Sequence, residues 1–120
     1  MDNSGPCEVS NDLRREIVRR ARDKKLRTFE FEPTVWNPTQ VLNPESKIPF
    51  TDITAWHFIA DQLESGCHVQ AVELHRPKGE IGYEMLFQGL PDYPKIYVKV
   101  RLHKHRIIGR SFHNSTGGEI

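Results

Sequence analysis

The clearest pattern of hydrophobic and polar positions lies near the C-terminus, in residues 95–113. Its first half alternates strictly between an apolar set and a polar set. The apolar set is Ile96, Val98, Val100 and Leu102, and the polar set is Tyr97, Lys99, Arg101 and His103. Alternation with period two and β-branched residues predicts a half-buried strand. Residues 106–113 are also strand-like, so the segment predicts an antiparallel hairpin with one apolar face and one polar, basic face.

The register of this hairpin decides which side chains share the basic face, because a slip of one residue turns every side chain over. With a two-residue loop, Tyr97 and Lys99 share their face with Arg106 and Arg110. With a three-residue loop they share it with His113 instead, and Arg110 faces the core unless a β-bulge intervenes. Both registers are compatible with the sequence. Tyr97, Lys99 and His113 lie together only with the three-residue loop or with a bulge.

Two helices are predicted upstream of the hairpin. The first follows a cap at Ser10 or Asn11 and runs to about Lys25. Its apolar positions recur every four residues, at Leu13, Ile17 and Ala21. The second begins at Thr51 or Asp52 and ends at Gly66, which is a natural C-terminal stop. Its expected buried stripe is Ile53, Trp56, Ile59, Ala60 and Leu63.

The period changes from helical to two after the second helix, which predicts strands over residues 68–75 and 80–88 before the hairpin. Residues 28–32 alternate briefly and are a candidate edge strand. Helices followed by a run of hairpins predict an α+β fold, with two N-terminal helices packed on a four-stranded, mainly antiparallel sheet. We expect a single domain over residues 11–113, with flexible tails at 1–10 and 114–120.

Composition narrows the class of protein without changing this fold. The chain has 120 residues, 37% of them hydrophobic and 28% charged, which is typical of one small soluble domain. No apolar run approaches the roughly 18 residues of a membrane span, and the N-terminus has no signal-peptide pattern. Two cysteines are too few for a disulfide framework. We therefore expect a cytoplasmic protein without a membrane partner.

Charge is distributed unevenly although the net charge is only +1. Residues 14–27 carry a balance of +6, residues 28–93 a balance of −7, and residues 95–113 hold six Lys or Arg and no acid. Either the basic segments bind an anionic partner such as RNA, or they neutralise the acidic segments across the fold. Both readings stay open at this point.

The motifs of several enzyme classes are missing. The chain has no glycine-rich phosphate loop, no CxxC pair, no HExxH and no GxSxG. His57 and Asp61 lie four residues apart, but no further ligand has suitable spacing, so we expect no metal and no cofactor. The His, Lys, Arg and Tyr side chains of the hairpin remain. Metal-free RNA cleavage needs a base for the 2′-hydroxyl, an acid for the leaving 5′-oxygen and cations for the phosphorane, and these residue types can supply them.

The two strands of the hairpin read Ile-Tyr-Val-Lys-Val-Arg at 96–101 and Ile-Ile-Gly-Arg-Ser-Phe-His at 107–113. They resemble the C-terminal hairpin of MqsR/RelE-type toxins, which are small, metal-independent bacterial messenger-RNA interferases neutralised by a cognate antitoxin. The resemblance implies a RelE-like sheet. It matches the family's tyrosine to Tyr97, its strand lysine to Lys99 and its terminal catalytic lysine to His113. The family's catalytic glutamine falls near Glu84.

The sequence therefore predicts a metal-independent endoribonuclease of toxin–antitoxin type, with RNA as substrate and a cognate antitoxin as partner. His113 and Tyr97 take the proton roles and Lys99 holds phosphate. The predicted nucleic-acid contacts are Arg101, Arg110, His103, Arg106, Arg15, Arg19 and Arg22. The alternatives are a non-catalytic α+β protein that docks RNA or an acidic protein, and an interaction subunit whose sheet edge pairs with a partner.

Overall fold

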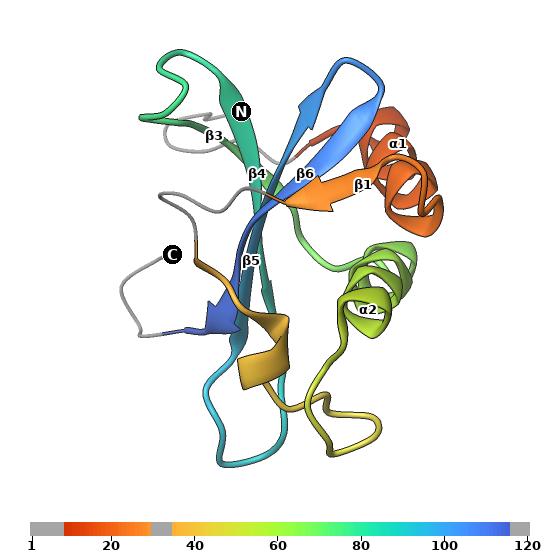
Figure 1. Cartoon of the computed structure of the whole chain (residues 1–120), viewed down its shortest axis with the longest axis vertical. Helices are drawn as coiled ribbons and strands as arrows, with labels where there is room; N and C mark the ends of the chain where they lie inside the picture. Colours follow the sequence, from red (N-terminus) through yellow and green to blue (C-terminus); the bar gives the residue numbers. More distant parts are fainter. Residues whose placement is uncertain (1–8, 30–34, 116–120) are drawn as a thin grey trace.

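The computed structural model describes residues 9–29 and 35–115 of the chain, which form two layers, with both helices on one side of a single sheet (Figure 1). The elements, in order, are α1 (Asn11–Arg22), β1 (Arg27–Phe29), β2 (Val35–Trp36), the 3₁₀ turn η1 (Pro38–Gln40), α2 (Asp52–Glu64), β3 (Gln70–Glu73), β4 (Ile81–Phe87), β5 (Ile96–His103) and β6 (Arg106–Asn114). The predicted α+β class is therefore confirmed.

The sheet has six strands in the order β1-β6-β5-β4-β3, and β2 also pairs with β6. Strands β3 to β6 form the predicted antiparallel meander. The prediction of four strands was wrong, because β1 and β2 add parallel pairs on the outer side of β6. These two strands have three and two residues, too few to show a period. Of the candidate edge strand at 28–32, residues 28 and 29 belong to β1, and residues 30–32 lie outside the described residues.

Helix α1 starts where the sequence suggested. The Ser10 side chain caps it by accepting a hydrogen bond from the backbone N–H of Leu13 at 3.2 Å. Its buried residues are Ile17, Val18 and Ala21. They pack the helix against α2 and the sheet, and the arginines are left on its other sides.

Helix α2 buries four of the five residues predicted for its stripe, all except Ile53. Thr51 and Thr54 form a reciprocal capping box at its start. Its buried residues are Ala55, Trp56, Phe58, Ile59, Ala60 and Leu63. Ile53 was expected in this stripe but is 59% exposed. Phe58 is buried in addition, and its ring packs edge-on against Phe50 at 5.1 Å and Phe87 at 5.4 Å, between ring centroids.

The long proline-rich connection before α2 is held by aromatic side chains. Trp36 lies 4.9 Å from Trp56 and 5.5 Å from Phe112, between ring centroids. Phe50, at the other end of the connection, lies 5.0 Å from Phe112. These rings fill the space between α2 and the sheet, and both β2 and η1 contact β6.

The predicted tails are described only in part. Val9 donates its backbone N–H to Val69 at 3.1 Å, and Ser115 donates to Lys95 at 2.7 Å. Residues 1–8 and 116–120 lie outside the described residues. Within the described part of the chain, neither helix has the length and apolar character needed to cross a membrane.

Candidate functional site

The β5–β6 hairpin combines the two features that the sequence left open. Its loop has two residues, Lys104 and His105, and Lys104 takes a positive φ of 57°. His103 is then paired with Arg106. Farther along, the register shifts between Lys99 and Val100, because Arg110 is an extra residue on β6. The hairpin is therefore a two-residue loop followed by a β-bulge.

The bulge changes which residues share a face. Beyond it, Lys99 pairs with Ser111 and Tyr97 pairs with His113. Directly opposed residues of two strands point to the same side of a sheet. Tyr97, Lys99 and His113 thus lie on the sheet face opposite the helices, which we call the second face. The Tyr97 and His113 rings are 5.3 Å apart, and Lys99 Nζ lies 5.9 Å from the Tyr97 ring centroid.

Glu84 lies at the centre of this group. It projects from β4 between its two cross-strand neighbours, Gln70 and Lys99. The Tyr97 hydroxyl donates a hydrogen bond to Glu84 Oε2 at 2.5 Å, and Gln70 Nε2 donates to Oε1 at 3.3 Å. Lys99 Nζ is 3.8 Å from Oε2. A carboxylate only 8% exposed needs such partners, because burial of an unpaired charge is costly.

We call Gln70, Glu84, Tyr97, Lys99 and His113 the Glu84 cluster. Sequence reasoning reached Glu84 only through the family resemblance, and it missed Gln70. The alternation in β4 is an independent signal for Glu84. Met85 and Phe87 face the core, so Glu84 had to face the other way, onto the face of the basic hairpin side chains.

The chemical state of His113 follows from one contact. Its Nδ1 lies 2.8 Å from the backbone oxygen of Asn114. A carbonyl oxygen only accepts, so Nδ1 carries a proton and donates it. In the neutral ring, the lone pair therefore lies on Nε2. Tyr97 beside it is only 4% exposed.

A cavity of about 380 Å³ lies beside the Glu84 cluster and shares Lys99 with it. We call it the basic cavity. It is lined by Glu73, Leu74, His75, Arg76, Lys99 and Arg110. Because of the bulge, Arg110 lines the same cavity as Lys99. The volume lies within the roughly 300–1,000 Å³ of ligand pockets.

The other predicted contacts on the hairpin lie away from the cluster. Arg101 is largely buried and faces Glu80, with 3.8 Å between NH1 and Oε1. His103 and Arg106 are exposed at the hairpin loop. His103 is four residues from Lys99, which corresponds to about 13 Å along a strand. These residues can reach only a ligand that extends beyond the Glu84 cluster.

The predicted contacts on α1 lie in the helix layer, on the other side of the sheet (Figure 1). Arg15 pairs with Asp12, and Arg19 pairs with Glu16 at 2.7 Å. Arg22 Nη2 reaches Asp61 on α2 at 2.8 Å. The structure therefore does not bring these arginines to the Glu84 cluster. The Arg22 pairs are an instance of basic and acidic segments neutralising each other across the fold.

These ion pairs shift the ionisation of their members. Hydrogen bonds from Arg19 and Arg20 lower the pKa of Glu16 to about 2. Asp61 and Glu64 raise the pKa of Arg22 above its ordinary value. Tyr83 lies on β4, on the sheet face that packs against the helices, and burial raises the pKa of its hydroxyl. Arg15, Arg19 and Arg22 thus already have carboxylate partners that an RNA phosphate would have to replace.

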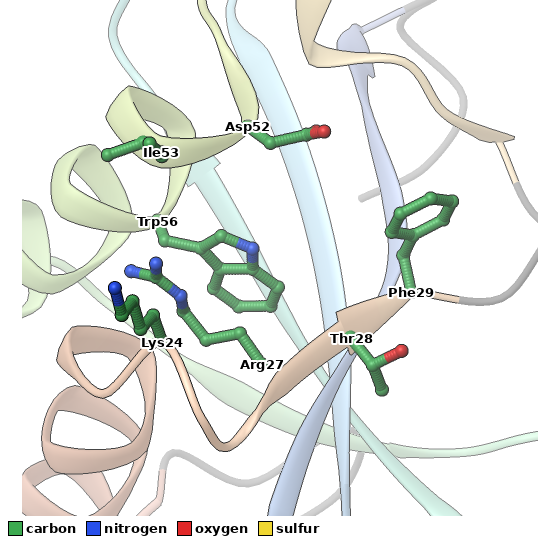
Figure 2. Close-up of a pocket in the computed structure, with 7 residues that line it drawn as sticks. All are labelled: Lys24, Arg27, Thr28, Phe29, Asp52, Ile53 and Trp56. Atoms are coloured by element: carbon green, nitrogen blue, oxygen red, sulfur yellow. The ribbon is translucent and has the colours of Figure 1, made fainter.

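Figure 2 shows a smaller cavity between β1 and the start of α2. The cationic groups of Lys24 and Arg27 lie near the Trp56 indole, while Phe29 and Asp52 lie on the far side. Arg27 NH1 donates to the Ala21 carbonyl at 3.1 Å, at the C-terminal end of α1. The volume of about 240 Å³ is below the usual range for a ligand site. Of these two cavities, the basic cavity is the stronger candidate. A larger cavity of about 520 Å³ lies in the helix layer, away from the Glu84 cluster, and Arg15, Arg19 and Arg22 are among the residues that line it.

Within residues 9–29 and 35–115, no three or more His, Cys, Asp or Glu side chains are arranged to hold a metal ion. His57 is exposed, and Asp61 beside it on α2 pairs with Arg22 instead. The Cys67 thiol lies 3.3 Å from the Gln62 side-chain oxygen.

The chain was compared with known proteins at three levels. Protein-family models, curated proteins and solved structures give no match to it. The likeness to MqsR/RelE-type toxins therefore rests on the hairpin residues themselves.

Proposed function

We propose that this protein is a metal-independent endoribonuclease of toxin–antitoxin type, with its cleavage centre in the Glu84 cluster. The observation that carries the proposal is the bulge at Arg110. Because of it, Tyr97 pairs with His113 and Lys99 lies on the same face. A two-residue loop without the bulge would turn His113 to the core. The hairpin resemblance supports a RelE-like enzyme and a cognate antitoxin as partner.

In the proposed reaction, each group of the Glu84 cluster has one role, which its contacts support. The RNA 2′-hydroxyl gives its proton to the Tyr97 oxygen, while the Tyr97 proton moves to Glu84 along their 2.5 Å hydrogen bond. The 2′-oxygen attacks the phosphorus and forms a 2′,3′-cyclic phosphate. His113, protonated on Nε2, gives that proton to the leaving 5′-oxygen. Lys99 stabilises the extra negative charge on the phosphorane.

Cleavage in EDTA tests this function. Purified protein should cut RNA to leave 2′,3′-cyclic phosphate and 5′-hydroxyl ends, and its overexpression should arrest growth. His113→Ala should lower the rate roughly 10²- to 10⁴-fold, the usual contribution of a proton-transfer group. His105→Ala is the matched control, because it removes a histidine from the exposed hairpin loop. Cleavage by His113→Ala within a few-fold of wild type would show that the centre is elsewhere.

One observation favours a second function, RNA binding without cleavage. Tyr97 is 4% exposed, and its hydroxyl is already hydrogen-bonded to Glu84. RNA can therefore reach this hydroxyl only if the groups that bury it move. In that case the protein binds RNA with an affinity that falls steeply between roughly 50 and 200 mM salt, but does not cut it. Two Gln variants then locate the RNA. If RNA lies on the second face, Lys99→Gln should flatten the salt dependence of the RNA affinity. If RNA lies on α1, the triple replacement of Arg15, Arg19 and Arg22 by Gln should flatten it instead.

A further inference from the structure

The basic cavity is assembled by segments that are far apart in the sequence. Glu73, Leu74, His75 and Arg76 come from the end of β3 and the turn that follows it. Lys99 comes from β5, and Arg110 from the bulge in β6. The fold thus brings three cations and a histidine to one hollow, against a single acid. A surface of this charge attracts anions.

The floor of the basic cavity is apolar. Leu74 is buried and lies against the backbone of β4 at Gly82, where a Cβ atom would come within 2.6 Å of Leu74 Cδ2. The Leu74 backbone N–H donates to Glu80 at 2.8 Å, which fixes the turn. Gly82 therefore lets Leu74 sit low in the sheet. A cavity with an apolar floor and cationic walls suits a ligand that has both a phosphate and a sugar or base.

The walls offer two kinds of phosphate contact. Arg76 is exposed on the turn, and its planar guanidinium can bind two phosphate oxygens at once. Lys99 supplies a point charge, and it also touches Glu84 of the cluster. Because Lys99 belongs to both sites, a ligand in the basic cavity lies directly beside the proposed cleavage centre.

We infer that the basic cavity is a nucleotide subsite for RNA. It binds the phosphate of a nucleotide next to the cleaved one through Arg76 and Lys99, and its sugar and base lie over Leu74. This inference rests on the proposed function in one respect, namely that RNA is the ligand of the second face. It adds Leu74, His75 and Arg76, which neither the sequence patterns nor the hairpin resemblance had indicated.

The test uses a nucleotide that the enzyme cannot cleave. Uridine 3′-monophosphate is titrated into the whole protein by calorimetry, and inorganic phosphate is titrated separately. The nucleotide should bind more tightly than phosphate, because only it contacts Leu74. Arg76→Gln should weaken nucleotide binding about 10-fold, as expected for a lost charge-assisted contact. Lys78→Gln is the control, since it removes a cation of the same turn that does not line the cavity.

Cleavage kinetics separate this inference from the proposed function. Arg76→Gln should raise the KM for RNA and leave kcat within a few-fold, because it removes binding and not a proton-transfer group. The wild type could cleave RNA but bind no nucleotide, or Arg76→Gln could bind the nucleotide as tightly as the wild type. Either result would overturn the subsite and leave the proposed endoribonuclease function standing. Arg76-dependent nucleotide binding by a protein that does not cleave RNA would uphold the subsite and overturn the enzyme. An equal loss of binding in Lys78→Gln would also overturn the subsite, since the effect would then be one of general charge.

Discussion

Gly109 is the position at which a single methyl group should do most harm. A Cβ atom there would lie 2.6 Å from Cε3 and Cζ3 of Trp36. Carbon atoms pack best at about 3.5–4.0 Å, so the indole would have to move by about 1 Å. It has little room, because Trp56 and Phe112 lie 4.9 and 5.5 Å from it, between ring centroids. Gly109→Ala should therefore destabilise the protein.

The size of the effect follows from two opposing terms. Forcing a methyl group into a packed core costs about 1–3 kcal/mol. Replacing Gly by Ala also restricts the unfolded chain, which returns about 0.4–1 kcal/mol. The net loss in the free energy of unfolding should be about 1–2 kcal/mol. For a domain of this length, that corresponds to a fall in Tm of roughly 4–8 °C.

Urea unfolding followed by circular dichroism measures this loss. The matched comparison is the same substitution in a Trp36→Leu background, where the methyl group meets a smaller, flexible side chain. Gly109→Ala should cost little there, and the double-mutant cycle isolates the contact. If Gly109→Ala were as stable as wild type in the native background, Trp36 would not lie on Gly109. The pairing of β2 with β6 would then be wrong.

Two further predictions concern carboxylates. Glu84→Ala should lower the free energy of unfolding by about 1–3 kcal/mol, because it leaves the buried Tyr97 hydroxyl without its acceptor. Tyr97→Phe should cost less, and equal urea midpoints for wild type and Glu84→Ala would contradict the contact. Glu16, with a pKa lowered from 4.5 to about 2, should stabilise the fold fully above about pH 4.5 and lose this effect as the pH falls towards 2. Its exposure limits the effect to about 0.2–1 kcal/mol, and Glu16→Gln should remove it from the acid unfolding profile.

The sequence by itself determined the elements that carry a long local period. Residues 96–103 alternate over eight positions, and they form β5 with the predicted two faces. The caps of both helices were also readable, because Ser10 and Thr51 act on backbone groups only three residues away. Such features depend on residues that are close in the sequence, so they can be predicted without knowledge of the rest of the fold.

Tertiary packing decided the features that depend on distant partners. Strands β1 and β2 exist because β6 offers them a parallel edge, and their own residues are too few to predict it. Helix α2 leaves Ile53 exposed and buries Phe58, whose ring packs against Phe50 and Phe87. Local periodicity predicts neither the two short strands nor the burial of Phe58, because both depend on contacts with residues that are distant in the sequence.

Tertiary packing also decided which hairpin residues share the second face. Gly109 and Phe112 are three residues apart, so on a regular strand they would face opposite sides of the sheet. The aromatic core takes both, since Trp36 packs on Gly109 and on Phe112. One extra residue is needed between them, and Arg110 is that residue. The sequence supplied Tyr97, Lys99 and His113, but the packing around Trp36 placed them on one face.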